Sequence, residues 1–396
     1  MTPHETEGAP PAAAGAAPRR RLRPRQVALR IALAIVVGVV LLEGSLRFLL
    51  FSDALAKTRV AARLRRPELY SAAECRDYWK LEVLFSTLPR RARPHPQVDE
   101  RVGWRKRDLD PATLAHVDEA KLAGRRPVLL FGDSYAQCVS SVNACWQDLL
   151  ERSELAESLA LLNYGVGGYG LDQMLLLERA VLDRFEADDP IVVIALLVDD
   201  DLDRPWLPLR NNPKPWFSLA DGELVLHPME ETDSVSWVHA HPPRIPSYLA
   251  RLLLFGSGWL RSSTAIRFTP DRGHEAGKKA LDERLLDSLT AELRERELRF
   301  FFLLLHGQGA LVAPGPSGWQ EPFLYDYFQM RGLPFVSSKR WLLSRARVTG
   351  AKLDSFYIAD GPGKNHYNDE GNAVAFEALL QGLLGHFEPY EYLAPE

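Results

Sequence analysis

Apolar runs and helix-length segments alternate along the second half of the chain. Five short apolar runs predict buried strands: "VLLF" (128–131), "LALL" (159–162), "IVVIALLV" (191–198), "FFFLLL" (300–305) and "LPFV" (333–336). The eight-residue run is typical of a parallel strand that is covered on both faces, because polar residues do not alternate with its apolar ones.

Four segments between and after these runs have the length and pattern of helices: 171–186, 275–297, 318–330 and 368–386. The last is amphipathic, with Phe376, Leu379 and Leu383 on one face. Strands that alternate with helices predict βαβ units, and therefore an α/β fold with a mostly parallel five-stranded sheet and helices on both faces. Residues 205–265 interrupt this alternation, and "SLADGELVLH" predicts a hairpin around Asp221-Gly222.

A long apolar stretch, residues 27–51, lies near the N-terminus and follows the basic cluster "RRRLRPR". Its uncharged centre would span only about 18 Å as a helix, whereas a bilayer core measures about 30 Å. A spanning helix must therefore include Arg30, which can reach toward the headgroups, and Glu43, which can pair with Arg47. We predict an uncleaved transmembrane helix, with a cleaved signal peptide and a buried soluble helix as the alternatives.

The basic cluster indicates the orientation and the remaining divisions of the chain. Residues 1–26 are rich in Ala, Pro and Gly and predict a disordered basic tail. This tail would stay cytoplasmic, which places the domain at 125–390 outside the membrane, in the periplasm of a bacterium. Residues 52–124 form a connecting region. The net charge of −4 gives no indication of nucleic-acid binding.

Polar and glycine-rich sequence follows three of the predicted strands. The first strand ends in Gly132-Asp133-Ser134, the second runs into "NYGVGGYG" (163–170) and the third into "DDDLD" (199–203), while His366 precedes the last helix. Parallel sheets bind ligands at the carboxyl ends of their strands. Acyl transfer needs a serine, a base to take its proton and N–H donors for the oxyanion, and it needs no cofactor.

With these motifs in this order, residues 125–390 resemble the SGNH (GDSL-type) hydrolases, in particular the bacterial branch with one N-terminal membrane helix, which "VGW" (102–104) also fits. The resemblance implies a flavodoxin-like three-layer α/β/α fold. It assigns Ser134 as the nucleophile and His366 as the base. The backbone N–H groups of Ser134 and Gly168 would form the oxyanion hole. Ala136 fills the last position of a Gly-x-Ser-x-Gly motif, which argues against an α/β-hydrolase elbow.

The sequence departs from the family pattern at the position of the third oxyanion donor. The family has an asparagine after the third strand, where this chain has Asp199 or Asp200. An ionised carboxylate cannot donate a hydrogen bond. Either burial protonates the aspartate, or another donor replaces the asparagine, or activity is low.

A second departure concerns the acid that would orient His366. The family places it three residues before the histidine, where this chain has Gly363. We assign the role to Asp360, with Asp354 as the reserve, and a Ser–His dyad without an acid remains an alternative.

The chain has three cysteines, and two of them flank "CVSSVNAC". A helix would hold Cys138 and Cys145 too far apart to bridge, but this segment favours a loop. In an oxidising compartment we predict a disulfide between them, with Cys75 left over. The alternative is that they are small buried thiols. "HAH" (239–241) has metal-ligand residue types but no third partner, so we assign it to a loop and predict no metal site.

These inferences together predict a membrane-anchored, outward-facing serine ester hydrolase. An acylated cell-envelope glycan or a lipid is the expected ester substrate. Two alternatives remain. One is an O-acyltransferase that uses the same serine on envelope glycans, and the other is a non-catalytic scaffold that binds glycans.

Overall fold

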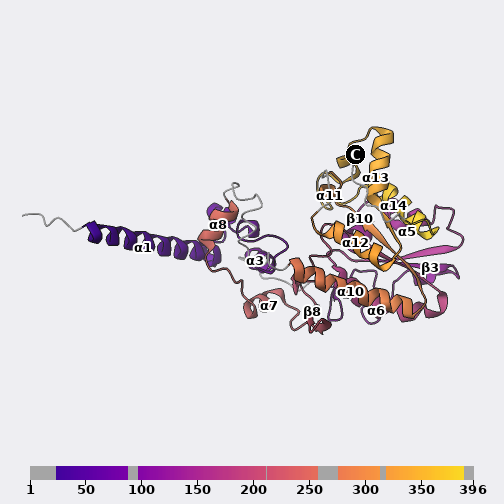
Figure 1. Ribbon diagram of the computed structural model, residues 1–396, viewed down its shortest axis with the longest axis horizontal. Helices are drawn as coiled ribbons and strands as arrows, with labels where there is room; N and C mark the ends of the chain where they lie inside the picture. The colour runs from indigo at the N-terminus through magenta and orange to yellow at the C-terminus, as the bar shows by residue number, and fades with distance from the viewer. Residues whose placement is uncertain (1–23, 88–96, 211, 257–274, 313–317, 388–396) are drawn as a thin grey trace, which may run out of the picture.

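The computed structural model describes residues 24–87, 97–210, 212–256, 275–312 and 318–387 (Figure 1). Most of the predicted N-terminal tail, residues 1–26, lies outside the described residues.

The centre of the fold is a five-stranded sheet in the order β11-β10-β5-β3-β4. Its strands are β3 (Arg126–Gly132), β4 (Leu159–Gly165), β5 (Ile191–Leu197), β10 (Arg299–Leu305) and β11 (Phe335–Ser337). All of its neighbouring strands pair in parallel. Numbered along the chain, the order is 2-1-3-4-5, which is that of flavodoxin-like sheets. This topology confirms the predicted fold class and all five predicted strands.

Helices cover both faces of the sheet, which gives three layers (Figure 1). One face packs against α6 (Leu171–Val181), α10 (Glu275–Glu295) and α12 (Gln320–Arg331). The other packs against α5 (Trp146–Leu150), α13 (Ser338–Thr349) and α14 (Asp369–Leu383). Side chains of a strand alternate between faces, so Leu129 and Phe131 belong to one core while Val128 and Leu130 belong to the other. The two cores account for the nearly unbroken apolar runs of the strands.

The four predicted helices are present, but α13 is an additional helix. Its sequence is mostly polar, and of its apolar side chains Leu342 is fully buried. The pattern therefore lacked the apolar stripe that marks an amphipathic helix.

Residues 205–265, which interrupt the alternation of strands and helices, contain the predicted hairpin. Strands β8 (Trp216–Ala220) and β9 (Glu223–His227) pair antiparallel. The two turn residues, Asp221 and Gly222, have φ values of 53° and 85°, as a tight two-residue turn that matches the twist of the strands requires.

The remaining helices and strands are α2 (Arg59–Leu64), α3 (Arg76–Thr87), α4 (Ser134–Gln137), α7 (Ser234–Ala240), α8 (Tyr248–Gly256), α11 (Gln308–Val312), β1 (Val98–Asp99), β2 (Gly103–Trp104), β6 (Leu209–Arg210) and β7 (Asn212–Pro213).

The apolar N-terminal stretch forms one long helix, α1 (Pro24–Phe51), that extends away from the sheet (Figure 1). Its segment Arg25–Phe51 is long and apolar enough to cross a membrane, and its most apolar part is not buried against the rest of the chain. Glu43 forms the predicted ion pair with Arg47, at 2.6 Å. The same carboxylate accepts hydrogen bonds from the N–H groups of Tyr248 and Leu249. It therefore caps the start of α8, a helix some two hundred residues later in the chain.

Glu178 on α6 is a buried carboxyl group whose two oxygens lack a hydrogen-bond partner among the described residues. Burial, reinforced by the nearby Glu292 carboxylate, raises the pKa of Glu178 from its usual 4.5 to about 8. The folded protein therefore keeps this proton between pH 4.5 and 8, where the unfolded chain loses it. Glu178 thus makes the free energy of unfolding fall as the pH rises through this window.

We predict that Glu178→Gln flattens this dependence. Relative to wild type, the variant should gain on the order of 3 kcal/mol of stability between pH 4.5 and pH 8. Chemical denaturation at several pH values measures the gain, with the exposed Glu157→Gln as the control. A variant whose stability keeps the pH profile of wild type would contradict the prediction.

Candidate active site

Ser134 begins the short helix α4 at the carboxyl end of β3. The side chain of Asp133 caps this helix by accepting a hydrogen bond from the N–H of Tyr135 at 2.8 Å. Gly132 is required before them, because a Cβ atom there would lie 2.5 Å from the Cβ of Ala136 and 2.7 Å from the carbonyl oxygen of Ala195. The Gly-Asp-Ser sequence is therefore the tight junction that places Ser134 at the edge of the sheet.

His366 lies directly opposite Ser134. Its Nε2 atom is 2.8 Å from the Ser134 Oγ atom, although the two residues are 232 positions apart. Tyr135 contributes to this approach, because its hydroxyl donates a hydrogen bond to the carbonyl oxygen of Asn365 at 2.6 Å. Its ring also packs against the imidazole, with centroids 4.9 Å apart. The neighbour of the serine thus holds the segment that carries the histidine.

Two backbone carbonyl groups orient the imidazole. The Nδ1 atom of His366 is 3.1 Å from the oxygen of Gly363 and 3.3 Å from that of Lys364. A carbonyl only accepts, so Nδ1 carries the proton in this network and Nε2 is left to accept from Ser134. This is the protonation state that a general base for the serine requires.

The structure does not bring the predicted acid, Asp360, to His366. Asp360 and Asp354 are both exposed, and neither is among the described partners of the imidazole. The physical reason is the turn between Asp360 and the histidine. Gly361 and Gly363 have φ values of 82° and 84°, and this turn directs backbone carbonyls, in place of a carboxylate, at Nδ1. The geometry is that of a Ser–His dyad held by the main chain.

The loop after β4 reaches the serine through Gly167 and Gly168. A Cβ atom at Gly167 would lie 3.8 Å from the Cβ of Ser134. The N–H of Gly167 is already used, because it donates to the Gln137 side chain at 2.7 Å. Gly168 has a φ of 85°, a conformation that favours glycine. Of these two N–H groups, only that of Gly168 has no described partner.

Trp104 determines the direction of that N–H group. Its indole N–H donates to the carbonyl oxygen of Gly167 at 3.0 Å. In a trans peptide the C=O and the following N–H point in opposite directions, so holding the Gly167 carbonyl also aims the Gly168 N–H. The Arg210 guanidinium holds the next carbonyl, that of Gly168, at 3.0 Å. Trp104 belongs to the "VGW" motif, whereas nothing in the sequence pattern distinguished Arg210.

The aspartates at the usual asparagine position have different surroundings. Asp200 forms ion pairs with Arg204 and Arg210. Burial raises the pKa of Asp200, but the two guanidinium groups outweigh burial and lower it below its ordinary value. Asp200 is therefore ionised and cannot donate to an oxyanion, so burial does not make Asp200 a donor. The carboxylate of Asp199 instead faces Gly307, and burial raises the pKa of Asp199.

Arg204 links this acidic segment to the nucleophile. It is buried, and its Nη1 atom lies 3.2 Å from Asp133 and 2.5 Å from Asp201. The Ser134 hydroxyl is in turn 3.3 Å from the Asp133 carboxylate. Sequence patterns did not point to Arg204, because its partners come together only at the sheet edge.

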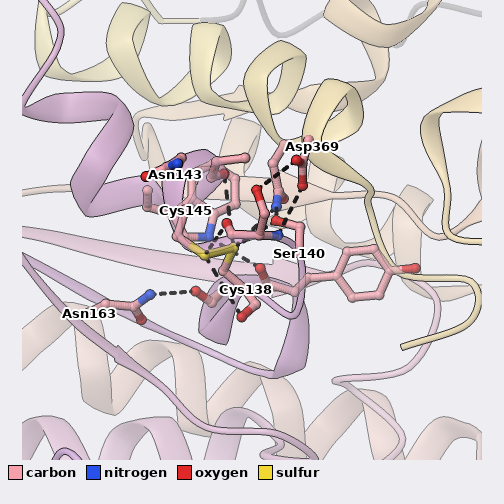
Figure 2. Close-up of a disulfide and its surroundings, with 12 residues drawn as sticks. Cys138, Ser140, Asn143, Cys145, Asn163 and Asp369 are labelled. Carbon is pink, nitrogen blue, oxygen red and sulfur yellow. Dashed lines mark hydrogen bonds between the residues drawn. A yellow bond between two sulfur atoms is a disulfide. The ribbon is translucent and has the colours of Figure 1, made fainter. Parts of the chain in front are cut away.

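Cys138 and Cys145 form the predicted disulfide, with Cα atoms 5.6 Å apart (Figure 2). Cys75 is buried and is not part of this disulfide, as expected. The loop closed by the disulfide is tied to α14, because the Asp369 carboxylate accepts from the N–H and hydroxyl of Ser141 at 3.0 and 2.6 Å. The loop that the disulfide closes therefore connects the end of α4, the helix of Ser134, to the start of α14.

The described residues contain no group of three or more metal-ligand side chains that could hold a metal ion. In "HAH", the His241 ring stacks on Trp237 with centroids 4.4 Å apart.

No family model and no curated protein matches this chain. Solved structures do match it. A two-domain esterase active on acetylated mannans is 12% identical over 71% of this chain, with a TM-score of 0.36, and this chain spans only 55% of that protein. An acetyl xylan esterase is 13% identical over 65% of this chain and 99% of its own, with a TM-score of 0.35. A lipase/acylhydrolase from Enterococcus faecalis is 14% identical, and the match covers 67% of this chain and 100% of that protein, with a TM-score of 0.36. Similarity this low leaves the function to be inferred from the geometry of the site.

We predict that Trp104→Phe lowers kcat for p-nitrophenyl acetate about tenfold and leaves KM within about twofold. The substitution keeps an aromatic side chain but removes the N–H that holds Gly167. If the Gly168 N–H binds the oxyanion, it loses part of its orientation, a fraction of the effect of deleting a donor. Steady-state kinetics measure the split, and Trp341→Phe on α13 is the matched control. An unchanged kcat would show that Trp104 does not position the donor.

Asp360→Ala should retain kcat/KM within about twofold, because backbone carbonyls already occupy the Nδ1 side of His366. Removing the acid of a true catalytic triad costs about 10⁴-fold. The same ester assay distinguishes the two cases, with His366→Ala as the inactive reference. A loss of more than a hundredfold would restore the acid role to Asp360.

Proposed function

We propose that the protein is a serine ester hydrolase of the SGNH type. The observation that carries this proposal is the 2.8 Å hydrogen bond between Ser134 Oγ and His366 Nε2. It lies at the carboxyl edge of a parallel sheet, next to the glycine loop whose Gly168 N–H has no described partner.

The first half of the reaction forms an acyl-enzyme. The Ser134 oxygen attacks the acyl carbonyl of the ester while Nε2 of His366 takes its proton. The carbonyls of Gly363 and Lys364 accept from Nδ1–H and favour the imidazolium that results. The backbone N–H groups of Ser134 and Gly168 bind the oxyanion of the tetrahedral intermediate. Collapse of the intermediate breaks the ester C–O bond, and His366 returns the proton to the departing alcohol.

The second half of the reaction hydrolyses the acyl-enzyme. A water molecule gives a proton to His366 and attacks the acyl carbon. The second tetrahedral intermediate collapses by breaking the bond to the Ser134 oxygen, which takes the proton back from His366 as the acid is released. Asp200 does not replace the family asparagine as a donor. Its pairing with Arg204 and Arg210 compensates its charge, which reduces the repulsion that an isolated carboxylate would exert on an oxyanion.

The proposal extends to location. We infer that α1 anchors the protein in a membrane and that the catalytic domain faces outward. Three features support this: the apolar, unburied segment within Arg25–Phe51, the arginine cluster before it in the sequence, and the disulfide, which an oxidising compartment favours. The expected substrates are then acyl esters of the cell envelope.

A fluorophosphonate ester probe tests the chemistry directly, because it labels serines whose hydroxyl is activated by a base. Wild-type protein should be labelled, Ser134→Ala should not, and His366→Ala should react at least a hundredfold more slowly. The exposed Ser355→Ala is the matched control and should label like wild type. Equal labelling of wild type and Ser134→Ala, or no labelling of either, would refute the serine hydrolase.

A further inference from the structure

A cavity of about 600 Å³ opens beside the oxyanion loop. Gln97 and three stretches line it: residues 104–108, several residues between Gln137 and Gln147, and Val166 with Gly167. Gln137 and Gly167 are joined by a hydrogen bond, and a Cβ at Gly167 would lie 3.8 Å from that of Ser134. One end of the cavity is therefore next to the nucleophile.

The cavity wall carries positive charge on Arg105, Lys106 and Arg107. Lys106 pairs with Asp108 at 3.4 Å. Arg105 donates to backbone carbonyls, including that of Leu109 at 2.7 Å, and Arg107 is exposed. Within the described part of the chain, neither arginine has a carboxylate at ion-pair distance. The carboxylates of Asp99 and Asp110 interact with Arg105 at longer range and compensate part of its charge, whereas the exposed Arg107 presents its charge to a ligand.

The polar side chains of the cavity also suit a hydroxylated ligand. Gln147 lines the wall, and its Oε1 atom is buried without a hydrogen-bond partner among the described residues. A buried acceptor without a donor is unfavourable, and a ligand hydroxyl would supply that donor. Gln137 and Ser140 add further polar groups to the wall.

The same features decide which half of the ester the cavity fits. An acyl chain is apolar, and placing it here would remove the two guanidinium groups from water without supplying a counter-charge. The alcohol half can instead carry carboxylates, and arginine binds carboxylates with paired, charge-assisted hydrogen bonds.

We propose that this cavity binds the alcohol half of the substrate and that this half is an acidic oligosaccharide with carboxylate groups. The substrate class rests on the proposed hydrolase function, but binding of the deacylated sugar does not. The cavity would hold the sugar chain while the acyl group faces Ser134, so the protein would remove acyl groups from a polyanionic glycan.

Isothermal titration calorimetry of the full-length protein in detergent tests this site with two probes that contain no ester. Hexagalacturonate should bind, and neutral xylohexaose should bind at least tenfold more weakly. Arg107→Gln should weaken hexagalacturonate binding about threefold and Arg105→Gln/Arg107→Gln about tenfold, both at low salt. Raising the NaCl concentration to about 0.5 M should reduce these differences, because salt screens exposed charges. Arg345→Gln, an exposed arginine on α13, is the matched control and should bind like wild type.

The results distinguish this site from the hydrolase itself. Wild-type protein that reacts with the fluorophosphonate probe but binds both hexasaccharides equally would overturn the acidic subsite and leave the hydrolase intact. So would hexagalacturonate binding that is unchanged in the double variant. Selective hexagalacturonate binding that the arginine substitutions weaken supports the subsite even if the probe labels no serine, in which case only the hydrolase fails.

Discussion

Two glycines at the ends of neighbouring strands allow the helix of the nucleophile to sit directly on the sheet. A Cβ at Gly132 would lie 2.5 Å from Ala136, and a Cβ at Gly165 would lie 2.6 Å from the backbone carbon of the same residue. No larger side chain fits at either position without moving α4 away from the strands. The position of Ser134 depends on this close approach, and so do the contacts that α4 makes.

The residues around Ser134 each hold a different part of the site. Asp133 pairs with Arg204, Tyr135 holds the carbonyl of Asn365 beside His366, and Gln137 holds the N–H of Gly167. Five successive residues thus connect the arginine cluster, the histidine segment and the glycine loop. The disulfide at Cys138 extends the same unit toward α14 (Figure 2). A shift of α4 would therefore disturb the segment of His366 and the glycine loop after β4 together.

The acidic run after β5 owes its properties to the ion pairs that surround it. Asp133 and Asp201 are both buried beside the same guanidinium nitrogen of Arg204, and these two carboxylates would repel one another without it. Removing one partner of such a buried network is costly, because the remaining charges lose their compensation. Arg204 and Arg210 therefore stabilise the site as well as neutralise Asp200. Arg210 additionally contacts the Gly168 carbonyl, so the arginine cluster and the oxyanion loop form one structure.

The positions and burial of the strands followed from the sequence alone, because runs such as 191–198 are apolar on both faces, as a covered parallel strand requires. The approach of His366 to Ser134, with the glycine loop after β4 beside them, was expected from the family resemblance and from the shared edge of the parallel strands. The disulfide was predictable because the residues between Cys138 and Cys145 disfavour a helix.

Only the tertiary structure decided how these groups are held. The orienting groups of His366 are backbone carbonyls, which leave no side-chain signal, and Asp360 was chosen because side chains are all that a pattern shows. Trp104 acts on Gly167 from a segment before the sheet begins, and Arg210 reaches Asp200 and Gly168 from the excursion after β5. Such contacts are hydrogen bonds between residues that are distant in the chain. The local pattern of apolar and polar residues does not show how distant segments are oriented toward one another, so it cannot predict these bonds.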